Sequence, residues 1–124
     1  MSRIKDIVFD CPKPSALARF WEQVLTDYSI LPYDDEEIAR LASLGLTPET
    51  DYSVIMTGPG PRICFQQVTE PKSTKNRVHL DLLADDPSAE VERLCALGAT
   101  VHFEGDGWTT LLDPEGNEFC VMSD

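Results

Sequence analysis

The stretch Pro14-Ser15-Ala16 recurs as Pro87-Ser88-Ala89, and each copy follows a strand-like run of residues and opens a helix-like run. A second pair of stretches matches near the end of each half, Gly60-Pro61-Arg62-Ile63-Cys64-Phe65 and Gly116-Asn117-Glu118-Phe119-Cys120-Val121. An internal repeat of this kind decides architecture before any local propensity does. The sequence therefore predicts two copies of one structural unit in tandem.

Each copy predicts the order strand, helix and then short strands. The first helix, about 15–25, carries apolar residues at helical spacing: Leu17, Phe20, Trp21, Val24 and Leu25. The second helix, about 87–97, begins after Asp86 as N-cap and ends at Gly98. Strands are expected near residues 7–10, 28–31, 52–57, 62–68, 79–82, 100–103, 109–112 and 118–122, separated by turn signals.

The first copy contains extra sequence at about 34–45, which predicts an added helix because it begins with acids suited to a helix N-terminus and ends at a glycine. Such a helix could serve as a lid. Residues 70–76 are polar and read as a linker, too short to separate independent domains. We therefore expect one domain over 1–124, with module one at 1–69 and module two at 77–124.

The composition is that of an acidic globular domain. The 124 residues are 42% hydrophobic, with 22 Asp and Glu against 10 Lys and Arg and a formal net charge of −12. This charge removes the electrostatic basis for binding nucleic acid or an anionic membrane, so neither is expected as a partner. No apolar run could span a bilayer and the start lacks a signal-peptide pattern, so we expect a cytoplasmic protein. The four cysteines form no Cys-x-x-Cys pair and are expected to be thiols.

Side chains alternate across a strand, so the best strands can be divided into two faces. One face is entirely apolar and is expected to lie under the helices: Ile7, Phe9, Ile63, Phe65, Leu80, Leu82, Phe119 and Val121. The other face is mostly polar: Asp6, Val8, Asp10, Arg62, Cys64, Gln66, His79, Asp81, Leu83, Glu118, Cys120 and Met122. Because this face mixes thiols, Met and Leu with charges, we expect it to line a cleft, and plain solvent-exposed surface is the alternative.

Four stretches together resemble a known family: Asp10-Cys11-Pro12-Lys13-Pro14-Ser15-Ala16-Leu17-Ala18-Arg19-Phe20-Trp21, Arg77-Val78-His79-Leu80-Asp81-Leu82, Leu97-Gly98-Ala99 and Leu112-Asp113-Pro114-Glu115-Gly116-Asn117-Glu118-Phe119. They are similar, over nearly the whole chain, to the glyoxalase-like, or vicinal oxygen chelate, superfamily. The resemblance implies an α+β fold of two tandem βαβββ modules, with curved mixed sheets around a central cleft. It selects no function, since the superfamily includes glyoxalases, epimerases, extradiol dioxygenases, fosfomycin-inactivating thiol transferases and metal-free proteins that sequester bleomycin.

The resemblance also implies a metal site. Enzymes of the superfamily take ligands from the first and last strand of each module, and these positions correspond here to Asp6, Cys64, His79 and Cys120. A divalent ion is expected on that basis, with Zn, Mn, Ni or Fe as candidates. The cysteines stand where the family usually has Glu, so the set would suit Zn²⁺. The alternative is that both cysteines are buried as small hydrophobic residues.

His79 could also act in acid/base chemistry without a metal. Asp81 lies on the same strand face and could orient the imidazole, and Glu118 is a second carboxylate for proton transfer. For ligand contacts we expect Asp10, Arg62, Gln66 and Trp108. Arg62 could bind a ligand carboxylate or phosphate, or pair with Glu118 across the pseudo-twofold axis. Trp108 could cap the cleft or seal the end of the fold.

Two functions follow from these residues. The first is an enzyme of lyase, isomerase or dioxygenase type that acts on a small oxygenated substrate through His79. The second is a metal-free protein that binds and sequesters a small organic molecule or drug, and a protein-interaction module is a third reading. We expect a homodimer, because a two-module sheet leaves strand edges and apolar helix surface that a second copy could cover.

Overall fold

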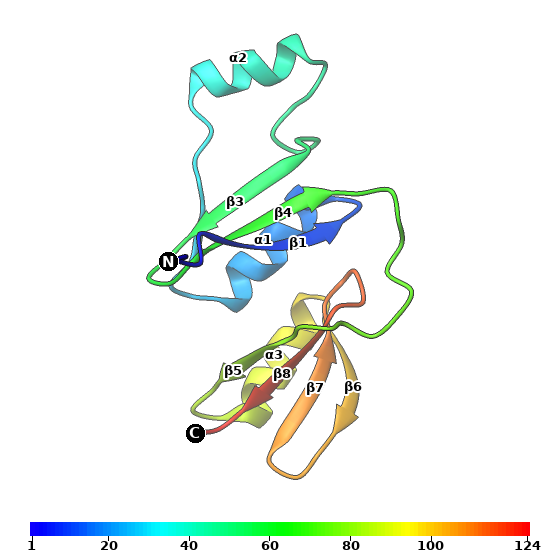
Figure 1. Ribbon diagram of the computed structural model, residues 1–124. Coiled ribbons are helices and arrows are strands. Elements are labelled where there is room, and N and C mark those ends of the chain that lie inside the picture. Colours follow the sequence, from blue (N-terminus) through cyan, green and yellow to red (C-terminus); the bar gives the residue numbers. More distant parts are fainter. The chain divides into compact units, whose positions relative to one another are not determined.

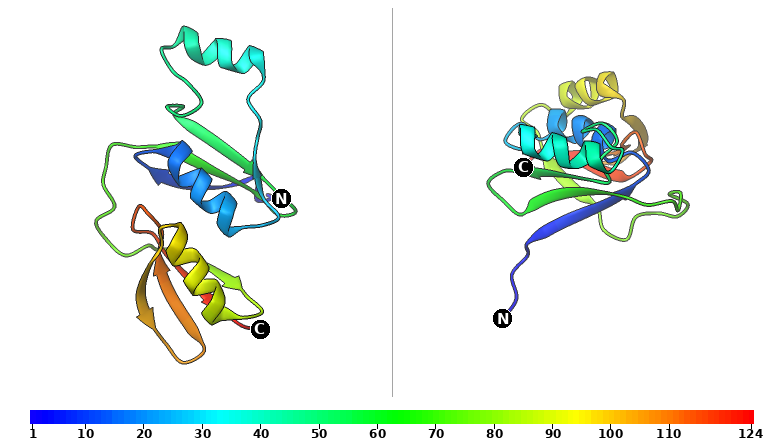
Figure 2. Two further views of the ribbon diagram at one scale, coloured as in Figure 1. Left: turned by 180° about the vertical axis from the view of Figure 1, so that it is seen from behind. Right: turned by 90° about the horizontal axis from the view of Figure 1, so that it is seen from above.

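In the computed structural model, which describes residues 1–124, each half of the chain builds its own four-stranded sheet. The division falls after Pro71, giving a first unit of Met1–Pro71 and a second unit of Lys72–Asp124. Figure 1 shows the element order of each unit, and Figure 2 shows a helix lying along each sheet. None of the three helices combines the length and the apolar character needed to cross a membrane.

The first unit has the order strand, helix, strand, added helix, strand, strand. Its elements are β1 (Asp6–Cys11), α1 (Pro14–Val24), β2 (Ser29–Ile30), α2 (Asp35–Ser43), β3 (Ser53–Thr57) and β4 (Arg62–Gln67). The strands lie in the order β1-β4-β3-β2, with β1 parallel to β4 and the other neighbours antiparallel. The added helix α2 occupies the predicted insertion, and the Asp34 side chain caps it by accepting a 2.8 Å hydrogen bond from the Glu37 N–H.

The second unit repeats this order without the added helix. Its elements are β5 (Leu80–Leu83), α3 (Pro87–Leu97), β6 (Thr100–Glu104), β7 (Trp108–Leu112) and β8 (Glu118–Met122). The strands lie in the order β5-β8-β7-β6, with β5 parallel to β8. Asp86 caps α3 as predicted, accepting from the Ala89 N–H, and Gly98 ends it with a φ of 120°. The predicted α+β fold of two tandem βαβββ modules with mixed sheets is confirmed.

Most strand boundaries differ from the prediction by one residue, and two of the differences have a structural consequence. The edge strand expected at 28–31 pairs only over β2, because the Tyr28 N–H bonds back to the Leu25 carbonyl at 3.1 Å and is held in a turn. β5 begins at Leu80, so His79 lies just before the strand. The second difference matters for the site, because a side chain at a strand end is less constrained by its neighbours.

α1 covers the apolar face of the first sheet. Its apolar stripe is buried, and Trp21 is only 1% exposed. The Phe9 and Trp21 ring centroids lie 5.4 Å apart, edge to face, and those of Phe9 and Phe65 lie 5.3 Å apart. The register aligns Phe9 with Phe65 and Phe65 with Val54, so all three share one side of the sheet. The predicted division of strand faces is therefore confirmed in this unit.

The second unit keeps the same division of faces. α3 packs against β6 and β8, where Leu94, Leu111 and Phe119 are buried. A tight turn fixes the start of β8: Asp113, 2% exposed, accepts hydrogen bonds of 2.9 Å from the N–H groups of both Glu115 and Asn117. The turn sets the register that aligns Cys120 with Asp81 and Thr110, so that its side chain lies on the sheet face opposite the buried apolar face.

Candidate functional site

The polar face of the second sheet brings three reactive side chains together. Asp81 on β5 is in register with Cys120 on β8, so both lie on the side opposite the buried apolar face. His79 places its Nε2 3.2 Å from Oδ1 of Asp81. The ligand atoms of His79, Asp81 and Cys120 all lie within 4.8 Å of one another, and we call these three residues the His79 cluster.

The His79 cluster combines the buried thiol of Cys120 with the solvent-accessible side chains of His79 and Asp81. Cys120 is 7% exposed, and its Sγ lies 3.3 Å from Oγ1 of Thr110 on the neighbouring strand β7. The side chains of His79 and Asp81 are 44% and 55% exposed. A molecule in solution can therefore reach the imidazole and the carboxylate without a rearrangement of the sheet.

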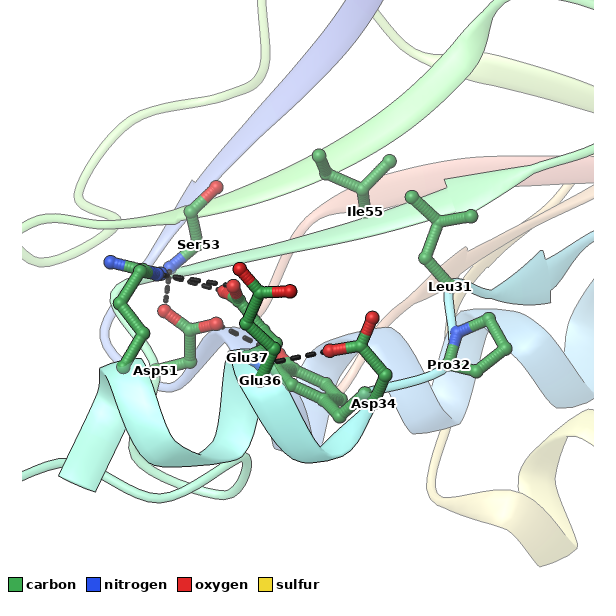
Figure 3. Close-up of a pocket in the computed structure, with 10 residues that line it drawn as sticks. Leu31, Pro32, Asp34, Glu36, Glu37, Asp51, Ser53 and Ile55 are labelled. Atoms are coloured by element: carbon green, nitrogen blue, oxygen red, sulfur yellow. Dashed lines mark hydrogen bonds and ion pairs between the residues drawn. The ribbon is translucent and has the colours of Figure 1, made fainter.

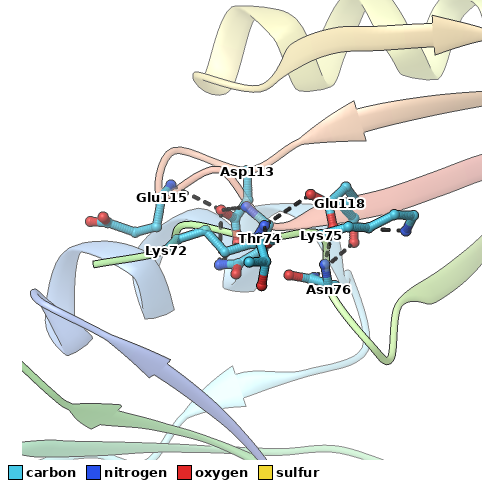
Figure 4. Close-up of polar contacts among 8 residues, drawn as sticks. Lys72, Thr74, Lys75, Asn76, Asp113, Glu115 and Glu118 are labelled. Carbon is cyan, nitrogen blue, oxygen red and sulfur yellow. Dashed lines mark hydrogen bonds and ion pairs between the residues drawn. The ribbon is translucent and has the colours of Figure 1, made fainter. Parts of the chain in front are cut away.

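Glu118 lies on the same face of β8 but is engaged by the predicted linker. Its carboxylate accepts hydrogen bonds from the Asn76 N–H at 2.6 Å and from Lys72 Nζ at 3.0 Å, and Lys75 Nζ lies 3.9 Å away (Figure 4). Burial raises the pKa of Glu118, but the hydrogen bonds and the two ammonium groups outweigh it, so the pKa lies below its ordinary value. Glu118 thus anchors the linker as a carboxylate, and it is not a member of the His79 cluster.

On the polar face of the first sheet, Arg62 binds Asp6. The parallel register of β1 and β4 aligns the two residues, and Nε and Nη2 of Arg62 donate to the two oxygens of Asp6 at 2.7 and 3.2 Å. This two-point contact holds the pKa of Asp6 below its ordinary value. Within its own unit, each of the two residues has an ionic partner: Asp6 for Arg62 and Lys72 for Glu118.

Cys64 lies beside this ion pair, on the same face of β4. It is 8% exposed, and burial raises the pKa of its thiol, as does the negative charge of Asp6.

The two units differ in how well they fit the implied metal. In the first unit both oxygens of Asp6 are bonded to the Arg62 guanidinium, so Asp6 already has a cationic partner. In the second unit the His79 cluster offers one nitrogen, one oxygen and one sulfur within reach of one ion, a donor set that suits Zn²⁺. This set includes Asp81, which was predicted only as a catalytic residue.

The remaining predicted ligand contacts also lie on polar faces. Asp10 on β1 is in register with Gln66 on β4, and both are exposed. Trp108 begins β7 in register with Met122, which places it on the same face as Cys120. Trp108 as a whole residue is 41% exposed. Its indole lies against the ring of Phe103, with the ring centroids 6.2 Å apart. It therefore presents an accessible aromatic surface.

The sequence analysis missed a cavity in the first unit. Its volume is about 550 Å³, and it lies between α2 and β3 (Figure 3). It is lined by Leu31, Pro32, Tyr33, Asp34, Glu36, Glu37, Arg40, Asp51, Ser53 and Ile55. Ser53 is in register with Gln66 and Ile55 with Cys64, so the cavity lies on the polar face of the first sheet. The acidic run at the start of α2 was the sequence signal in this region, and it was interpreted as the start of an added helix that could serve as a lid.

Comparisons with known proteins agree with this architecture. A glyoxalase-like domain model matches residues 6–122. Among solved structures, a glyoxalase/bleomycin resistance protein/dioxygenase family enzyme from Burkholderia phytofirmans PsJN has a TM-score of 0.69 and 16% identity, with 98% of each chain covered. The fosfomycin resistance protein FosX from Mesorhizobium loti has a TM-score of 0.69 and 15% identity, over 100% of this chain and 93% of its own. The trypanothione-dependent glyoxalase I of Leishmania major has a TM-score of 0.62 and 12% identity, over 99% and 87%.

At these identities the solved structures share the fold and say nothing of the reaction. No curated protein matches the chain in sequence. The family model, by contrast, covers all of the strands and helices from β1 to β8. The resemblance seen in the motifs is therefore confirmed, and the chain belongs to the glyoxalase-like family of the vicinal oxygen chelate superfamily.

Proposed function

We propose that this chain binds a small oxygenated organic molecule on the polar face of its second sheet, where His79 transfers a proton. The observation that carries the proposal is the contact between Nε2 of His79 and Oδ1 of Asp81 at 3.2 Å. In a state in which Nε2 carries the proton and faces Asp81, Nδ1 would be free to accept a proton from the ligand.

The reaction class that fits this pair is proton abstraction next to a carbonyl or from a hydroxyl group, a step common to lyases and isomerases. The exposed indole of Trp108 on the same face would stack on an unsaturated ligand. Asp10, Arg62 and Gln66, the other predicted ligand contacts, lie on the polar face of the first sheet.

A divalent metal is the alternative form of this proposal, because a histidine nitrogen that binds a metal cannot also accept a proton. His79, Asp81 and Cys120 would hold it, and Zn²⁺ suits their donor atoms. When bound, such an ion polarises a ligand oxygen and makes a neighbouring proton easier to remove. The accessible sides of His79 and Asp81 leave room for a ligand beside them.

One observation favours the second candidate function, a metal-free binding protein. The first unit places a guanidinium on Asp6, at a position that the family pattern would use for a metal ligand. The Arg62–Asp6 pair fills this position with a neutral ion pair, so no ion is needed there to balance the Asp6 carboxylate. On this reading the polar faces bind and sequester a ligand without turning it over.

The two candidates are separated by metal content and by proton exchange, with a matched control. The chain has two histidines, and His102 is exposed on β6 outside the His79 cluster. The dialysed protein, His79→Ala and His102→Ala are loaded with Zn²⁺, Mn²⁺ or Ni²⁺ and measured by elemental analysis. One equivalent of metal that is lost only in His79→Ala supports the metal-assisted enzyme. No metal in any sample supports the metal-free protein.

Acid/base chemistry is read directly from deuterium uptake. A panel of small hydroxy and keto acids is incubated with the protein in D₂O, and exchange at carbon is followed by proton NMR. We expect one class of compound to exchange with the wild type and with His102→Ala, and to lose exchange in His79→Ala. Exchange that survives in His79→Ala would remove His79 from the proposal.

A further inference from the structure

We infer that the cavity between α2 and β3 in the first unit binds an organic cation, an amine carried on a small apolar body. The cavity volume of about 550 Å³ lies within the range of small-molecule sites. Its lining divides into two parts. One wall is apolar, from Leu31, Pro32 and Ile55, and the other is acidic, from the start of α2 and from Asp51 (Figure 3).

Asp51 is a buried carboxylate with no direct ion pair, and the charge of Arg40 acts on it only at longer range. The residue is 9% exposed, and it accepts hydrogen bonds from the Tyr33 hydroxyl at 2.9 Å and from the Ser53 N–H at 3.3 Å. Both donors are neutral, and no lysine or arginine lies within ion-pair distance of it. A buried charge without an opposite charge is costly, and a carboxylate can accept more than two hydrogen bonds. An ammonium group in the cavity would supply both the charge and the donors that Asp51 lacks.

Arg40, the one cationic residue in the lining, forms an ion pair with Glu37. Arg40 donates from Nε and Nη2 to the two oxygens of Glu37, at 3.1 and 2.6 Å, within the same helix. This pair cancels its own charge and leaves Asp34, Glu36 and Asp51 as net negative charge around the cavity. The field in the cavity therefore attracts cations and repels carboxylates and phosphates.

Tyr33 supports the same reading. Burial and the neighbouring Asp51 raise the pKa of its hydroxyl well above the ordinary value, so the hydroxyl remains a hydrogen-bond donor to Asp51. Its bond to Oδ2 fixes the orientation of the carboxylate within the cavity wall. A ligand would thus meet a carboxylate that is already positioned, which lowers the entropic cost of binding.

This inference goes beyond the proposed function, because it assigns a ligand class to residues of the first unit and uses none of the His79 cluster. The two ideas can therefore fail separately. Binding in the cavity is measured at equilibrium and needs no turnover. His79→Ala is expected to leave it unchanged.

The test uses three probes of one shape and different charge: benzylammonium, benzyl alcohol and benzoate. Each is titrated into the ¹⁵N-labelled full chain, and amide shifts are followed. We expect benzylammonium at millimolar concentration to shift the amides of residues 31–37 and 51–55, with an affinity that falls as salt is added. Benzyl alcohol should bind about tenfold more weakly or not at all, and benzoate should not bind.

Three variants decide whether the charge is the cause. Asp51→Asn should weaken benzylammonium binding by about tenfold or more, because the buried charge is removed. Since Asp51→Asn could disturb the fold, the exposed Glu36→Gln serves as a second test and should weaken binding by a smaller factor. Glu92→Gln, exposed on α3 in the second unit, is the charge-matched control and should bind as the wild type does.

Two results overturn the inference. Equal affinity for benzyl alcohol and benzylammonium would show that the cavity selects apolar shape only. Benzylammonium that shifts no amide of the first unit, or that binds Glu36→Gln and Glu92→Gln equally well, would show that the acidic wall does not recognise cations.

Discussion

Arg62 holds both carboxylate oxygens of Asp6, from Nε at 2.7 Å and from Nη2 at 3.2 Å. The contact exists because β1 and β4 are parallel neighbours whose register aligns these two positions. In the family pattern the Asp6 position would belong to a metal ligand. Here the negative charge of Asp6 is balanced by a side chain of the same unit, whereas His79, Asp81 and Cys120 in the second unit bring three possible metal-ligand atoms within 4.8 Å of one another.

The first prediction concerns the titration of Asp6. Arg62 lowers the pKa of Asp6, so Arg62→Gln should raise it toward the ordinary value of 3.8. A lowered pKa stabilises the folded state fully above the unfolded value and loses that effect as the pH falls through the folded value. The stability difference between wild type and variant should therefore vanish in acid. Carboxyl ¹³C NMR measures the pKa, and Arg40→Gln is the control that should leave Asp6 unchanged.

The second prediction concerns the reactivity of Cys64. Burial and the charge of Asp6 raise the pKa of this thiol, so alkylation should be slow. Asp6→Asn removes the second cause and should speed the alkylation of Cys64 by a few-fold, as read by peptide mass spectrometry. Cys120 is the internal control, because it is buried to the same degree, with 7% exposure against 8%. A parallel rise at both cysteines would mean that the variant has loosened the fold.

The third prediction concerns Glu118, which ties the linker to β8. Glu118→Gln should lower the free energy of unfolding by about 1–3 kcal/mol near neutral pH, because it removes charged hydrogen bonds from Lys72 and Asn76. The pKa of Glu118 is lowered from 4.5, so this loss should shrink as the pH falls below that value. Urea unfolding at two pH values measures it, and the exposed Glu92→Gln is the control. A loss that is independent of pH would assign the effect to packing.

The helices and the faces of the strands could be predicted because they depend on local periodicity. The apolar spacing of α1 and the N-cap of α3 can be recognised from residues that are close in sequence. The alternation of apolar and polar residues in β4 and β8 can likewise be recognised without knowing which strand lies beside them. The internal repeat extended these local signals to a two-module fold. This is why the α+β architecture was correct in both units.

The partners of the charged residues could not be predicted, because they depend on strand register and on loops. The sequence left a ligand anion or Glu118 open as the partner of Arg62, whereas the register of β1 and β4 aligns Arg62 with Asp6. Glu118 is bound by Lys72 and Asn76, in a segment without apolar positions that carried no signal of contact. The cavity was not predicted for the same reason, since its walls come from α2, β3 and the loops that join them.

The last prediction concerns how α2 is held over the cavity. Leu41 is fully buried although most of the helix is exposed, whereas Leu44, at its C-terminal end, is 59% exposed. Leu41→Ala should cost about 2–5 kcal/mol of local or global stability, and Leu44→Ala should cost less than about 0.5 kcal/mol.

Because α2 is an insertion between β2 and β3, we expect the loss in Leu41→Ala to appear first as faster amide exchange over Asp35–Ser43, with α1 and its buried Trp21 still protected. Hydrogen exchange with mass spectrometry measures both regions, and urea unfolding measures the total. Equal exchange rates in the two leucine variants would show that the flanking loops, and not Leu41, fix the position of the helix. The cavity would then keep its shape without this anchor, and binding of an organic cation would be indifferent to Leu41→Ala.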